Sequence, residues 1–231
     1  MYTEGSNLID RIKNPAKYVK NPSRRTPNRD TAFNDGDSVE RQLQEDGHKI
    51  WGWVIYRCTY ENDEEWVEFM RRLHFYNEET LRFHNALDMQ ANLNYRVFED
   101  RDRFDSMHPS AVLEHFTQWA ATAPQQEQGE SAYYWRSQRY NYCLHVDQEA
   151  LQSVIGASAP PADRFGAGYV NLVCKETIGG MRPEHTDDRA KRDRCFMRIN
   201  YQSLMVGWYS QLRSQGSWGN EYRIPPEVAK I

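Results

Sequence analysis

The chain has 231 residues and a formal net charge of −4, and 39% of its residues are hydrophobic and 13% aromatic. This composition supplies enough apolar side chains for a core and excludes a wholly disordered protein. The sequence holds no run of about 18 apolar residues, so we expect no membrane-spanning segment.

The first residues and the cysteines indicate the cellular compartment. Residues 1–10 lack the apolar stretch of a secretory signal peptide. The four cysteines form no CxxC pair and lie in or beside strand-like runs, where a free cysteine behaves as a small buried hydrophobe. We therefore expect reduced thiols and a cytoplasmic protein.

Residues 1–48 predict a flexible basic extension. They are polar, and Pro15, Pro22 and Pro27 interrupt any long helix. An excess of basic over acidic side chains in this arm suits binding to a polyanion, and a solvated tail is the alternative. The side chains that would contact a tRNA backbone are Lys13, Lys17, Lys20, Arg24, Arg25 and Arg29.

The folded part is predicted to begin with a strand over residues 51–59 and a helix over residues 62–85. Aromatic and β-branched residues without proline are typical of a buried strand. Asn62 or Asp63 can cap the helix, whose apolar residues then repeat at helical spacing. A tyrosine-bearing strand end therefore meets an acidic helix start, where many α/β proteins place their chemistry.

The rest of the chain alternates short strands and helices. Strands are predicted over residues 94–99, 136–146, 168–174 and 195–200. Ser106 and Asp147 are suitable caps for two further helices, and a last helix is predicted over residues 201–212. Residues 122–130 are predicted to form a loop.

This order predicts a single α+β or α/β domain over residues 49–231, with a mixed sheet and helices packed on it. A ferredoxin-like arrangement is the first expectation and a Rossmann-like layer the second. The Rossmann alternative lacks its glycine signature, because Gly166-Ala-Gly168 precedes a strand instead of joining a strand to a helix. The pattern leaves the oligomeric state open.

Two acidic stretches are candidates for the active site. The first helix start can supply a general base or hold an α-amino group, or it can simply face solvent. Its acidic residues are Glu61, Asp63, Glu64, Glu65 and Glu68. Glu99, Asp100 and Arg101 follow a strand and can converge with the first strand at one sheet edge. A surface loop held by ion pairs is the alternative for this second stretch.

Strand residues give three further candidates. Tyr56 and Arg57 lie on opposite faces of the first strand, so one is expected in the core and the other needs a partner or a ligand if covered. His145 lies near a strand end, where a structural histidine is more common than a catalytic one. The histidines lack the spacing of metal ligands, so we expect no metal site.

Three stretches resemble one family of fungal proteins. They are Trp51–Met70 (WGWVIYRCTYENDEEWVEFM), Tyr95–Asp105 (YRVFEDRDRFD) and Gly168–Lys175 (GYVNLVCK). Together they resemble the arginine-containing cyclodipeptide synthases of secondary-metabolite clusters, over residues 49–212. The acidic DDxxE-type motif associated with that family is matched only in part, by DEEWV at residues 63–67 and DDRAK at residues 187–191.

The resemblance implies a tRNA-dependent aminoacyltransferase. Such an enzyme joins arginine from arginyl-tRNA to a residue from a second aminoacyl-tRNA and closes the pair into a 2,5-diketopiperazine. Aminoacyl esters are already activated, so the reaction implies no cofactor, but it requires positioning, a base and oxyanion stabilisation. Carboxylates would hold the arginine guanidinium, and the basic arm would contact tRNA. Because the family's motif is matched only in part, the candidates for these roles come from the strand ends and helix start described above: Glu99, Asp100, Asp63 and Tyr56 for catalysis, and Glu64, Arg57, Arg101 and His145 for substrate binding.

Other classes of function stay open from the sequence. A noncatalytic module that binds nucleic acid or protein is favoured by the basic arm and disfavoured by the acidic remainder of the chain. An effector-type interaction protein is disfavoured by the lack of a signal peptide. An unrelated small-molecule enzyme would use the aromatic side chains to line a pocket.

Overall fold

A six-stranded mixed sheet with strand order β2-β1-β3-β4-β5-β6 forms the centre of the molecule. It is seen in a computed structural model that describes residue 25 and residues 34–129, 137–162, 168–175, 194–213 and 216–231. The strands are β1 (Val54–Arg57), β2 (Arg96–Phe98), β3 (Tyr142–Val146), β4 (Tyr169–Cys174), β5 (Phe196–Asn200) and β6 (Val228–Ala229). β1 is parallel to β2 and β3, β4 is antiparallel to β3 and β5, and β6 is parallel to β5.

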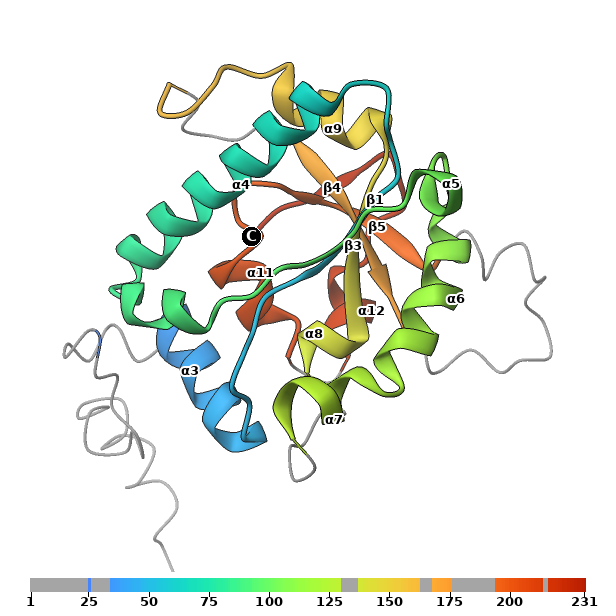
Figure 1. Cartoon of the computed structure of the whole chain (residues 1–231). Helices are drawn as coiled ribbons and strands as arrows, with labels where there is room; N and C mark the ends of the chain where they lie inside the picture. Colours follow the sequence, from blue (N-terminus) through green and yellow to red (C-terminus); the bar gives the residue numbers. More distant parts are fainter. Residues whose placement is uncertain (1–24, 26–33, 130–136, 163–167, 176–193, 214–215) are drawn as a thin grey trace, which may run out of the picture.

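Helices cover both faces of this sheet (Figure 1). One face carries α4 (Asp63–Phe83), α9 (Gln148–Ile155) and α11 (Val206–Gln211), and the other carries α5 (Arg101–Phe104) and α6 (Pro109–Ala120). The shorter or peripheral helices are α3 (Asp35–Asp46), η2 (Leu87–Asn92), α7 (Ala123–Gln128), α8 (Gln138–Asn141) and α12 (Ser217–Glu221). None of the helices in these described ranges is long and apolar enough to cross a membrane.

The alternation of side chains along β1 and the residue before it divides the core into two parts. Trp53 and Ile55 pack on the α4 side, whereas Val54 and Tyr56 pack on the α6 side. All four are fully buried. Because both faces of the strand are covered, the sequence here is a continuous apolar run, without the polar alternation of a half-exposed strand.

The long helix α4 begins at the predicted place. The side chain of Asn62 accepts hydrogen bonds from the backbone N–H groups of Glu64 and Glu65, so Asn62 is the N-cap and Asp63 is the first helical residue. The buried side of α4 includes Trp66 and Phe69. Its outer side is charged.

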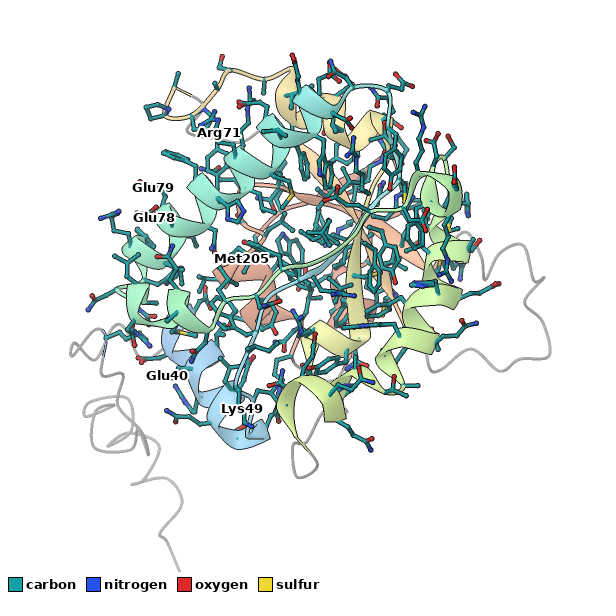
Figure 2. The ribbon with its side chains drawn as sticks, in the orientation of Figure 1. Glu40, Lys49, Arg71, Glu78, Glu79 and Met205 are labelled. Carbon is teal, nitrogen blue, oxygen red and sulfur yellow. The ribbon has the colours of Figure 1, made fainter. Side chains whose placement is uncertain are left out.

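That outer side of α4 carries Arg71, Glu78 and Glu79, all exposed to solvent (Figure 2). Arg71 pairs with Glu68, and the bonds from two arginines lower the pKa of Glu68 to about 2. Glu68 is therefore ionised at neutral pH and belongs to the solvated helix face.

The mixed sheet with helices packed on it confirms the predicted fold class. The topology differs from the ferredoxin-like arrangement that we expected first, because β2, β1 and β3 are parallel and helices cover both faces. This parallel half, with helical crossovers between its strands, is closer to the Rossmann-like alternative.

The folded domain begins before residue 49. Residues 35–46, which the sequence placed in a flexible extension, form α3, and Val39 of this helix is completely buried. Asn34 caps the helix, and Gly47 ends it with φ of 69°, in the left-handed region that favours glycine. Asp46 is ion-paired with Arg213 near the C-terminal end of α11. The predicted extension is therefore wrong for residues 35–46, since the three prolines all precede this helix.

Several element boundaries also differ from the prediction. Residues 123–128, expected in a loop, form α7. The N-cap of α6 is His108, whose Nδ1 accepts from the backbone N–H of Ser110, and Ser106 lies before the helix with a positive φ. The last predicted helix is confined to residues 206–211, and α12 and β6 follow it.

Candidate functional site

The candidate site lies where the three parallel strands end. Their carboxyl ends meet at one edge of the sheet, the place where open α/β sheets bind ligands. Arg57 ends β1 and residues 58–60 follow it, residues 99–100 follow β2, and residues 147–148 follow β3. We call this region the carboxyl edge.

A buried arginine organises the carboxyl edge. The guanidinium of Arg57 donates to the carboxylate of Asp63, and its Nη1 lies 3.5 Å from Oε2 of Glu99. Its Nε donates to the backbone carbonyl of Thr59 over 2.9 Å. Two of the predicted acidic residues, from separate elements, therefore converge on one cation.

Aromatic rings complete the surroundings of this cation. The guanidinium carbon of Arg57 lies 4.4 Å from the ring centroid of Tyr60 and 5.2 Å from that of Trp66. The Arg57 side chain is only 6% exposed, whereas those of Asp63 and Glu99 are 83% and 46% exposed. The two carboxylates therefore hold the internal arginine on one side and face solvent on the other.

Three other predicted site residues have different roles or positions. Asp100 is the N-cap of α5 and accepts from the backbone N–H of Arg103 over 3.3 Å. Arg101 is exposed, and its Nε lies 4.0 Å from Oδ2 of Asp105. Glu64 is exposed in the first turn of α4. In the described part of the chain, none of the three contacts Arg57 by a hydrogen bond or ion pair.

His145 is a buried connector between strands. Its Nε2 lies 2.8 Å from the carbonyl oxygen of Met107, which can only accept, so Nε2 carries the proton. Its Nδ1 accepts from the amide of Asn171 over 3.1 Å, and the same amide donates to Asp147 over 3.0 Å. Burial lowers the pKa of His145, which keeps the imidazole neutral. The geometry fits a structural histidine.

Tyr56 has a partner that the sequence did not single out. Its hydroxyl lies 2.7 Å from Nδ1 of His115 on α6. Burial raises the pKa of Tyr56, so its hydroxyl stays protonated and can donate the bond. Burial and the charge of Arg103 lower the pKa of His115, which favours a neutral imidazole. Tyr56 is completely buried and His115 is half-buried. Contact between substrate and the Tyr56 hydroxyl would therefore have to pass through His115.

Polar side chains of the site form a row across the sheet. The strand register aligns Phe98 with Tyr56, Tyr56 with His145, His145 with Asn171, and Asn171 with Arg198. Residues aligned in this way point to the same face, which is the α6 side. Asn171 was not among the predicted site residues, although a polar residue inside an otherwise apolar strand is a signal for it.

The predicted tRNA-binding arm is largely outside the described residues. Lys13, Lys17, Lys20, Arg24 and Arg29 all lie there. Arg25 is described and buried, and its guanidinium contacts Asp37, Glu40 and Asp88. Since these carboxylates surround Arg25, it serves to fasten the chain beside α3 and is unsuited to bind a phosphate.

The chain matches no protein-family model, no curated protein and no solved structure. The resemblance to cyclodipeptide synthases therefore stays a prediction. Within the described ranges, no group of three or more His, Cys, Asp or Glu side chains is arranged to hold a metal ion.

Proposed function

We propose that this protein is a tRNA-dependent cyclodipeptide synthase that joins arginine from arginyl-tRNA to a second aminoacyl residue and closes a 2,5-diketopiperazine. The observation that best supports this proposal is the convergence of Asp63 and Glu99 on the guanidinium of Arg57. Paired carboxylates are the natural ligands of a guanidinium. Their solvent-facing sides can accept hydrogen bonds from a substrate arginine while Arg57 stays in place.

A second support is spatial. The three stretches that carry the family resemblance contain β1 with the start of α4, β2 with α5, and β4. They are far apart in the sequence, yet their polar residues gather at or beside the carboxyl edge: Arg57 and Asp63 from the first, Glu99 from the second and Asn171 from the third. A shared local site would account for the resemblance of these stretches.

The proposed reaction uses groups that the carboxyl edge supplies. A carboxylate accepts a proton from one α-ammonium group, and the freed amine attacks the ester carbonyl of the other aminoacyl-tRNA. The carbon–oxygen ester bond breaks, and the departing 3′-oxygen takes up a proton. A second attack of the same kind closes the ring and releases the other tRNA. No oxidant or reductant is consumed, and the substrates place the enzyme in the cytoplasm.

The test is product formation by the purified chain. We expect a cyclic dipeptide containing arginine, identified by mass spectrometry, when the protein is incubated with a mixture of aminoacyl-tRNAs that includes arginyl-tRNA. The double variant Asp63→Asn, Glu99→Gln is expected to lose this product while remaining folded by circular dichroism. A protein that binds tRNA without forming any diketopiperazine would support the noncatalytic binding module instead and would overturn the proposal.

A further inference from the structure

A group of half-buried rings lies beside the carboxyl edge, on the α6 side of the sheet. It consists of Phe98 on the edge strand β2 and His115 and Trp119 on α6. The ring centroid of Phe98 lies 5.0 Å from that of His115 and 6.0 Å from that of Trp119. We call these three residues the ring patch. Phe98 directly precedes Glu99, so the ring patch borders the candidate site.

Two exposed arginines flank the ring patch. The guanidinium carbon of Arg96 lies 5.1 Å from the ring centroid of Phe98, and that of Arg103 lies 5.4 Å from the ring centroid of Phe104. The rings of Phe98 and Phe104 are themselves 6.2 Å apart, so both cations belong to one surface. In the part of the chain that the structure describes, neither guanidinium has a carboxylate within ion-pair distance. Both therefore have donors available for an anion.

The order of the stacked groups adds a further argument. The buried ring of Tyr56 stacks on Phe98 at a centroid distance of 4.8 Å, and the exposed guanidinium of Arg96 lies over Phe98. A planar guanidinium that rests on a ring offers a flat surface to a nucleobase, and half-buried aromatic rings do the same. Unpaired arginines beside such a surface suit the phosphates of a nucleic-acid backbone.

We infer that the ring patch with Arg96 and Arg103 binds the single-stranded 3′ end of an RNA. Its terminal bases stack on Arg96 and the rings, and its phosphates pair with the two arginines. A duplex fits less well, because its bases are already stacked on each other. This inference rests on the proposed use of aminoacyl-tRNA, and it places the acyl end of a bound RNA next to Glu99. It assigns RNA binding to the folded domain and not to the basic arm.

Fluorescence anisotropy with a labelled single-stranded RNA ending in CCA tests the inference on the full chain. The double variant Arg96→Gln, Arg103→Gln removes the two cations, and Phe98→Leu removes one ring while keeping an apolar side chain. We expect each to weaken binding about tenfold or more. The slope of log affinity against log salt should fall by about 1.4 in the double variant, since two phosphate contacts are lost. Arg82→Gln, an exposed arginine of α4 that is ion-paired with Glu78, is the matched control and should bind as the wild type does.

The outcomes separate this inference from the proposed function. Wild-type affinity in the double variant, or equal affinity of the wild type for single-stranded RNA and for a duplex of the same sequence, would overturn the RNA site even if a diketopiperazine is produced. Loss of RNA affinity in the double variant and in Phe98→Leu, with the control unchanged, would support the RNA site even if no diketopiperazine forms.

Discussion

The hydroxyl of Tyr56 donates a hydrogen bond of 2.7 Å to Nδ1 of His115, although the two residues are 59 positions apart in the chain. The bond joins the central strand β1 to α6 and fixes the imidazole as a neutral acceptor at Nδ1. It also places a titratable group of moderate exposure between the sheet and solvent, and this has a measurable consequence for stability.

Stability is expected to fall as the pH is lowered from about 7 to about 5. The fold holds the pKa of His115 and His145 below their usual value, so the unfolded chain takes up protons first, and this uptake stabilises the unfolded state relative to the fold. The stabilising contribution is fully present above the unfolded pKa of about 6.5 and is lost below it, by at most about 1.4 kcal/mol per pH unit for each histidine. Denaturant unfolding at several pH values measures this slope.

A variant isolates the contribution of His115 to the pH dependence of stability. His115→Gln keeps an acceptor for Tyr56 and removes the titration, so its slope should be smaller than that of the wild type. An unchanged slope in His115→Gln would show that this imidazole does not titrate differently in the fold.

The capping of α4 predicts unequal costs for two neighbouring substitutions. Asn62→Ala removes the acceptor for the backbone N–H groups of Glu64 and Glu65 and should destabilise the protein by about 1 kcal/mol. Asp63→Asn keeps the cap and weakens only the ion pair of a largely exposed carboxylate with Arg57, so it should cost less. Thermal unfolding of both variants compares the two costs, and a larger loss from Asp63→Asn would show that the ion pair with Arg57 contributes more to stability than the cap.

The packing of α3 against the core predicts that shortening its buried side chain lowers the stability of the protein. Val39 is completely buried, so Val39→Ala should destabilise the protein by about 2 kcal/mol through lost burial and a residual cavity. Val67→Ala is the matched control, because Val67 is 66% exposed on α4 and should change stability by less than about 0.5 kcal/mol. Equal midpoints in denaturant for the two variants would show that α3 is not part of the core.

The carboxyl edge predicts that two adjacent acids differ in function. Glu99→Gln removes a charge that faces Arg57 and solvent, and we expect at least about a tenfold loss of arginine incorporation. Asp100→Asn should retain close to wild-type yield, because asparagine caps α5 as well as aspartate does. The readout is diketopiperazine yield from equal amounts of folded protein. Loss of yield in Asp100→Asn alone would move the site from Glu99 to its neighbour.

Local signals in the sequence predicted much of the fold. The caps at Asn62 and Asp147, the apolar repeat of α4 and the aromatic run of β1 each depend on a few neighbouring residues, and the structure confirms them. Helix α3 was missed despite comparable signals, since Asn34 and Gly47 bound it on either side. The prolines before residue 28 indicate a flexible extension, and the predicted end of that extension at residue 48 lies beyond α3.

The candidate site was less accessible to prediction because it depends on strand order and register. The sequence supplied Asp63 and Glu99 as acids near an edge, but their common partner Arg57 follows from the parallel pairing of β1 with β2. His115 and Asn171 acquire roles only when α6 and β4 are placed against β1 and β3. No local pattern contains that information.

The polar row across the sheet also bears on how the strands find their partners. Side chains alternate between the two faces of a strand. If β4 shifted by one residue against β3, Asn171 would therefore move to the opposite face of the sheet and Leu172 would take its place. The two hydrogen bonds that the Asn171 amide donates, to His145 and to Asp147, would then be broken together. Misaligned sheets would contain buried polar groups without partners, so this row disfavours misfolded pairings as well as stabilising the native one.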